Sequence, residues 1–217
     1  EIVKSGQILT LIENPGKYED IINLQMDLDS FRYRIETPSS LKRLTFKGNP
    51  VLGEIQPYYA NFLKLFNDYI QFMELDYHNQ KINSINNEIR KLNDYSKRLN
   101  NQSHILKQEE NIASRQFKRD SMVFVQGVIP ESEYEKSKSG YLQKQYAYEQ
   151  SRITLASNEI QVTKLSQEIL DLELRKSEDN GKLRSALDEA ANKLYASIAE
   201  WEQKYVLKSS VEGIVSF

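Results

Sequence analysis

The fold is decided by a repeat of seven in the stretch from Ile82 to Ala113, which reads INSINNEIRKLNDYSKRLNNQSHILKQEENIA. In its clearest column, meaning a set of positions seven residues apart, every position is apolar: Ile85, Leu92, Leu99, Leu106 and Ala113. A second column passes through Ile82 and Ile89. Apolar residues at this spacing are typical of helices that pair along a seam. We therefore predict a long coiled-coil helix.

A second stretch of similar reach follows Glu131. Its seam is marked by apolar residues seven apart, namely Leu155, Val162 and Ile169, and by Leu165 and Leu172. The two stretches are separated by Gln126–Pro130, in which Gly127 suits a helix C-terminal cap and Pro130 suits the first position of a new helix. The sequence thus predicts two helical arms joined at one tip, pairing antiparallel, with Leu106 near residues 148–152.

The composition favours long paired helices over the compact core of a globular enzyme. The 217 residues include only 8 Gly and 5 Pro, with 39% hydrophobic and 28% charged residues. The net charge of -2 leaves no basic stripe, which argues against a nucleic-acid partner. There is no Cys, which excludes disulfides and thiolate sites. No run of about 18 apolar residues occurs, so we expect no membrane span in this chain.

The sequence contains no recognisable catalytic, metal or cofactor site. The two His residues, His78 and His104, lie far apart on predicted helix, and surface positions are their simplest interpretation. Gly-rich phosphate loops and nucleophile elbows are absent from the sequence. We therefore expect that the chain is not an enzyme.

Before the arms, residues 17–30 show helical apolar spacing, and residues 31–53 have the mixed composition of a linker. The aromatic cluster at 58–66 has two interpretations: packing against the short helix and the arm near Trp201, or a surface for a neighbouring subunit. In the return arm, Gly181 predicts either an interruption at 178–181 or a glycine tolerated on an exposed face.

The two ends of the chain carry a resemblance. Val3–Glu13 looks like the first half of a lipoyl-type motif and Tyr205–Val215 resembles its second half, with the helical hairpin in place of the lysine-bearing turn. Lys4 and Lys208 are not at that turn, so neither should be lipoylated. This arrangement resembles HlyD-like membrane fusion proteins, the periplasmic adaptors of type I secretion and tripartite efflux systems.

The resemblance implies a mainly α fold: a long antiparallel coiled-coil hairpin inserted between two partial β lipoyl/biotinyl-like half motifs. The expected organisation is a first half motif at 1–13, a short helix and linker at 14–56, the hairpin at 57–206 with its tip near 126–130, and a second half motif at 207–217. We expect a periplasmic subunit anchored to the inner membrane by a segment outside this chain.

The implied partners are an inner-membrane transporter, a TolC-like outer-membrane channel and further copies of the adaptor. An ABC transporter of peptides or proteins is favoured, with a multidrug efflux adaptor as the alternative. A cytosolic coiled-coil scaffold remains the alternative from another class, in which the end strands would be accidental apolar tails.

Adaptors that engage TolC-like channels resemble one another at the tip in an Arg, a Leu four residues later and a Ser eleven residues later. Here these positions are Arg119, Val123 and Pro130, so the hydroxyl is missing or shifted to Ser132. The residues predicted to contact the channel are Arg119, Val123, Phe124, Gln126, Gly127, Val128, Ile129 and Pro130. The alternative interpretations are an ordinary surface charge at Arg119 and apolar residues that only hold the turn.

Overall fold

The computed structural model describes residues 2–35, 38–46 and 48–214. It divides into two compact units, each treated separately below. The base consists of Glu1–Tyr77 and Arg175–Phe217, and the hairpin unit consists of His78–Leu174. The elements run β1 (Ile2–Val3), β2 (Ile8–Leu11), α1 (Tyr18–Arg34), α2 (Pro38–Leu41), η1 (Gly53–Ile55), α3 (Gln56–Leu75), α4 (Tyr77–Val125), α5 (Glu131–Tyr205), β3 (Val206–Lys208) and β4 (Gly213–Ile214).

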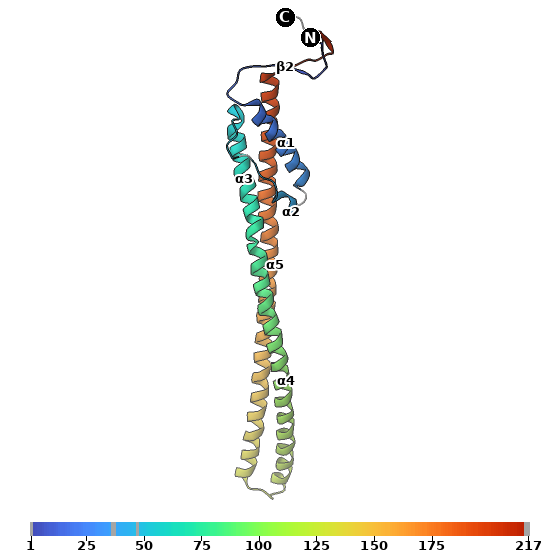
Figure 1. The fold of residues 1–217 in the computed structure, drawn as a ribbon. Helices are drawn as coiled ribbons and strands as arrows, with labels where there is room; N and C mark the ends of the chain where they lie inside the picture. The colour runs from blue at the N-terminus through green and yellow to red at the C-terminus, as the bar shows by residue number, and fades with distance from the viewer. Residues whose placement is uncertain (1, 36–37, 47, 215–217) are drawn as a thin grey trace. The chain divides into compact units, whose positions relative to one another are not determined.

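The base is built where α1 and α3 pack beside the C-terminal part of α5 (Figure 1). Helix α1 forms because its apolar residues recur every three or four positions and bury one face: Ile21, Leu24, Leu28 and Phe31. Acidic Glu19 and Asp20 lie in its first turn and basic Arg32 and Arg34 in its last, as the helix dipole favours. The sequence prediction ended this helix at residue 30, whereas it continues to Arg34 because Phe31 is also buried.

Aromatic side chains fill the centre of the base. Phe62 is fully buried, and its ring lies edge-on to Phe31 at 5.2 Å and to Phe46 at 5.1 Å between centroids. Trp201 of α5 is also buried and donates a hydrogen bond from Nε1 to Asn14 Oδ1 at 3.2 Å. Of the two interpretations of the aromatic cluster, packing on the short helix and on α5 is therefore confirmed for its buried members.

The two ends of the chain pair strand to strand. β1 pairs antiparallel with β4, with Ile2 opposite Ile214, and β2 pairs antiparallel with β3, with Leu11 opposite Val206. Gly6, at φ 80°, turns the chain between β1 and β2, and its N–H donates to Ser209 O at 2.7 Å. The two half motifs thus pair with each other within the described residues, while Val215 lies outside them.

Helix α5 runs without a break from Glu131 to Tyr205, so the predicted interruption at residues 178–181 is wrong. A methyl group on Gly181 would meet no atom within 4 Å, which means that nothing crowds this glycine. A glycine within a helix costs only about 1 kcal/mol relative to alanine. The interpretation of Gly181 as a tolerated residue on an exposed face is the correct one.

Within the hairpin unit, α4 and the first part of α5 run antiparallel. The Oγ atoms of Ser103 and Ser151 are 3.0 Å apart, and Lys107 Nζ lies 4.7 Å from the centroid of the Tyr148 ring. These contacts bracket Leu106, so its predicted position near residues 148–152 is confirmed.

The seam of this unit is less apolar than the sequence prediction implied. The column that starts at Ile82 and Ile89 continues through three polar residues, Ser96, Ser103 and Glu110. Ser103 and Glu110 are buried, as are Ile85 and Leu99 of the seam. The hairpin is therefore held by apolar and polar layers together.

Candidate functional site

The candidate site is the tip, where the end of α4 is closed by a glycine-dependent cap. Gly127 has φ 70°, its N–H donates to Phe124 O at 2.9 Å, and the N–H of Val128 donates to Val123 O at 3.1 Å. This pair of bonds is the Schellman motif, which satisfies carbonyls left open at a helix end. The backbone of the turn is thus fixed by its own hydrogen bonds.

Pro130 differs slightly from its expected place. α5 begins at Glu131, and Pro130 precedes it as the residue whose carbonyl accepts from the N–H groups of Glu133 at 3.0 Å and Tyr134 at 3.3 Å. Proline lacks an N–H of its own, so it loses nothing at this position. Glu131 and Glu133 in the first turn complement the positive end of the helix dipole.

The apolar side chains of the tip divide into two groups. Phe124 turns into the seam and stacks on Tyr134 with centroids 4.6 Å apart and planes at 14°. Val125 and Val128 are exposed, at 85% and 69% of their surface. Met122 is exposed as well, whereas Val123 and Ile129 are half-buried. The tip therefore carries an apolar surface outside its own packing.

An aromatic ladder below the turn was missed by the sequence prediction. Phe117 lies between Tyr134 and Tyr141, with centroid distances of 5.6 Å and 5.7 Å, and its ring is nearly parallel to that of Tyr141 at 6°. Together with Phe124, these rings close the end of the hairpin. The signal was available, because Phe117 and Phe124 continue the seven-residue column of Ser103 and Glu110.

Arg119, predicted to contact a partner, is exposed and forms a hydrogen bond within α4. Its guanidinium donates to Gln116 Oε1, and Gln116 Nε2 donates to Asp120 Oδ1 at 2.8 Å. Ser137 of α5 donates to Asp120 Oδ2 at 2.6 Å. The hydrogen bond from Ser137, followed by that from Gln116, lowers the pKa of Asp120. These hydrogen bonds connect Arg119 through Gln116 and Asp120 to Ser137 of α5. Gln126 and Ser132 are exposed as well.

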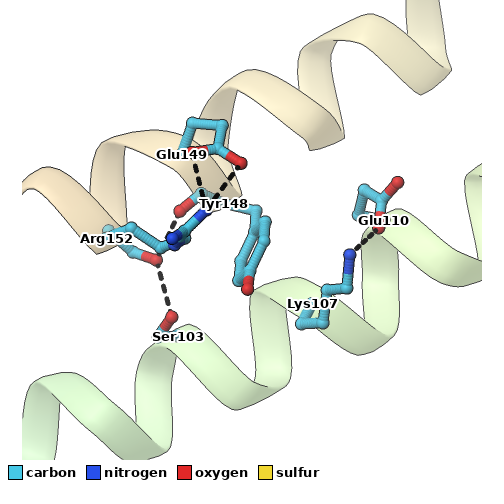
Figure 2. A network of polar contacts seen from close by, with 7 residues as sticks. Ser103, Lys107, Glu110, Tyr148, Glu149 and Arg152 are labelled. Carbon is cyan, nitrogen blue, oxygen red and sulfur yellow. Dashed lines mark hydrogen bonds and ion pairs between the residues drawn. The ribbon is translucent and has the colours of Figure 1, made fainter.

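A polar network crosses the seam farther from the tip (Figure 2). The Ser151 hydroxyl meets Ser103 and also lies 2.7 Å from Tyr148 O. On α4, Lys107 donates to Glu110 Oε2 at 2.9 Å, and this bond raises the pKa of Lys107.

The Tyr148 ring lies between two cations. Lys107 Nζ is 4.7 Å from its centroid and Arg152 Cζ is 5.9 Å away on the same helix as Tyr148. Arg152 also bonds Glu149 at 3.4 Å. Each cation pairs with a carboxylate one turn away on its own helix, Lys107 with Glu110 and Arg152 with Glu149, which suits a structural role in the seam.

The predicted site residues therefore share one place in the hairpin unit, with different roles. Arg119, Gln126, Val128 and Pro130 are exposed, and Gly127 sets the turn.

His104 is exposed and its Nε2 lies 3.2 Å from Gln108 Nε2. Across residues 2–35, 38–46 and 48–214, no group of three or more metal-binding His, Cys, Asp or Glu side chains comes together. In the same residues, every helix is too short or too polar to span a bilayer.

Comparison with known proteins gives little independent information. No family model matches the chain, and no curated protein matches it. A solved structure titled "Structure of the periplasmic adaptor protein EmrA" is similar over 99% of this chain and 59% of that chain. The sequence identity is 17% and the TM-score is 0.34. This chain thus spans less than two thirds of that protein, and a likeness at this level does not assign a family to it.

Proposed function

We propose that this chain is the hairpin-bearing part of a periplasmic adaptor that bridges an inner-membrane exporter to a TolC-like outer-membrane channel. It acts by spanning a distance and binding partners, without catalysing a reaction. The observation that carries the proposal is that the two ends of the chain pair, β1 with β4 and β2 with β3, while the helical hairpin is inserted between them. This is the arrangement that the resemblance of the end motifs implies.

The tip supports the choice of contact surface. Val125 and Val128 are exposed, and the turn is already closed by the Gly127 cap and by the stack of Phe124 on Tyr134. Exposed apolar side chains beside polar groups are typical of protein contacts. Arg119, oriented by Gln116, would supply a charge-assisted hydrogen bond to the channel.

The class of exporter is a finer proposal. An ABC transporter of peptides or proteins fits a long hairpin preceded by the extra helix α1, and a multidrug pump is the alternative. Several copies would align side by side in the assembled machine, each anchored to the inner membrane by a segment outside this chain. A cytosolic scaffold is less favoured, because accidental apolar tails would have no reason to pair as β1–β4 and β2–β3 do.

The test replaces Val128 with Asp and Arg119 with Ala in the full-length protein. A docking role predicts loss of export and of cross-linking from position 128 to the outer-membrane channel, with helical content and melting temperature near wild type. Ile112→Asp is the matched control, because Ile112 is an exposed apolar residue of α4 away from the turn. It should leave channel cross-linking intact. Unchanged export in the double tip variant would disprove tip docking.

A further inference from the structure

Helix α5 has two apolar faces within the hairpin unit, and only one of them meets α4. The seam face contains Tyr148, Ser151, Leu155 and Asn158, spaced three and four residues apart. The other face, here called the outer stripe, has large apolar residues at a spacing of seven or twice seven: Tyr146, Ile153, Ile160 and Leu174. Every outer-stripe residue is more than half exposed. In the heptad geometry the outer stripe lies opposite the seam.

Hydrophobicity explains this choice of face only in part, although the seam face also carries Tyr148 and Leu155. Between residues 146 and 160 the outer stripe presents Ile153 and Ile160, whereas the seam buries Ser151 and Asn158 at 8% and 5% exposure. At these positions, burying Ile153 and Ile160 in place of Ser151 and Asn158 would remove more apolar surface from water. Another interaction must therefore offset the burial of the two polar residues.

That interaction is the set of polar contacts between the arms. Asn158 Nδ2 donates to the backbone carbonyl of Leu92 at 3.1 Å, and Ser151 meets Ser103 at 3.0 Å. Nearer the tip, Ser137 donates to Asp120 at 2.6 Å. These three contacts, here called the polar layers, join α4 to α5 at three heights along the seam.

Turning α5 by half a revolution would break all of the polar layers at once. Ser103 would then face the outer stripe, which offers Ile153 and Ile160 in place of hydroxyl or amide groups. A buried polar group that loses its partner shifts an equilibrium by about tenfold or more. The penalties act together, because every layer depends on the same rotation of α5.

We propose that the polar layers select which of the two apolar faces of α5 packs against α4, and thereby keep the outer stripe exposed. This inference concerns how the hairpin pairs and does not depend on the adaptor function. The same physical effect operates when a single buried polar residue fixes the register of a coiled coil.

The chain has no Cys, so paired cysteines can report the face directly. The seam probe is Leu99→Cys with Leu155→Cys, since Leu99 is buried and Ser103 pairs with Ser151 one turn farther along each helix. The outer probe is Leu99→Cys with Ile153→Cys, because Ile153 lies on the outer stripe. In dilute protein, the monomer should form the seam disulfide readily and the outer disulfide hardly at all.

Two of the three polar layers are then removed by Ser103→Leu, Ser151→Leu and Asn158→Leu in both probe backgrounds, while the Ser137–Asp120 contact is kept. We expect the outer disulfide to increase about tenfold or more, relative to the native seam, as the second face becomes competitive. Adding Tyr146→Gln and Ile160→Gln should reverse this increase, because the outer stripe would lose its apolar residues. Circular dichroism verifies that helical content is retained.

A milder pair of changes, Ser103→Ala with Ser151→Ala, removes one layer without adding volume and should give a smaller increase in the outer disulfide. The proposal is overturned if the outer disulfide stays at its native level in both the leucine and the alanine variants while the seam disulfide forms fully. It is also overturned if the increase persists after the outer stripe is made polar.

Discussion

Gly127 and Gly140 should respond to the same substitution with opposite signs. Both lie in the hairpin unit, and a methyl group added at either would meet no atom within 4 Å. They differ in backbone conformation, because Gly127 has φ 70° at the end of α4 whereas Gly140 is inside α5. Alanine therefore tests the backbone alone, free of steric contacts.

The expected magnitudes follow from those conformations. At Gly127, alanine in the left-handed region costs about 1–2 kcal/mol, partly offset by the lower entropy of the unfolded chain, so a loss near 1 kcal/mol remains. At Gly140, alanine improves helix propensity by about 1 kcal/mol. The two variants should thus differ by about 2 kcal/mol, which is roughly a thirtyfold change in the opening equilibrium of the hairpin.

Amide hydrogen exchange is the suitable assay, because it reports the opening of the hairpin unit residue by residue, whereas a single melting temperature averages over both units. Protection at Leu99 and Leu106 should fall in Gly127→Ala and rise in Gly140→Ala. Gly127→Asn should lose less than Gly127→Ala, since Asn tolerates the left-handed region. Shifts of the same sign at Gly127 and Gly140 would refute this account of the turn.

Two further predictions concern the base. Phe62→Ala should lower the free energy of unfolding of the base by about 3–5 kcal/mol in urea titrations, because Phe62 is fully buried between Phe31 and Phe46, whereas Tyr58→Ala on the exposed side of α3 should change it by less than about 0.5 kcal/mol. Equal effects would contradict the assigned core. Burial, with the hydrogen bond to Asp29, raises the pKa of Tyr195 from 10.0 to about 12. Its contribution to stability is fully present below pH 10 and is lost as the pH rises through about 12, so unfolding titrations of Tyr195→Phe should lack that alkaline loss.

Much of the hairpin could be predicted from the sequence because its causes are local. The column through Ile85 and Leu99, and the glycine and proline at the turn, act within a few residues of themselves. The register of the arms then follows from their shared turn, and the Ser103–Ser151 contact agrees with it. At the tip, Phe124 was among the residues expected to contact a partner, and its ring stacks on Tyr134 within the hairpin.

Among the features that were not predicted are the polar residues of the seam and the continuity of α5 at Gly181. Ser103 and Glu110 look like surface residues when read along α4 alone, because the groups they meet are on α5 or one turn away. The predicted interruption at Gly181 is wrong for a different reason, because a single glycine costs a helix only about 1 kcal/mol and α5 continues through it. The seven-residue repeat of apolar residues identifies the seam. Which polar residues are buried in it depends on the hydrogen-bond partners that the folded hairpin supplies.

The exposed apolar residues of the tip require an explanation that geometry alone does not supply. A pair of helices must diverge into a turn, so some exposure there is unavoidable, and apolar residues could simply help to hold the turn. However, the turn is held by the Gly127 and Val128 backbone bonds and by the Phe124–Tyr134 stack, none of which uses the Val125 or Val128 side chain. Polar residues at these two positions would be more soluble and equally compatible with the cap. The side chains that the turn does not need are therefore the ones best explained by a partner, and Val128→Asp should impair binding while leaving the melting of the hairpin unchanged.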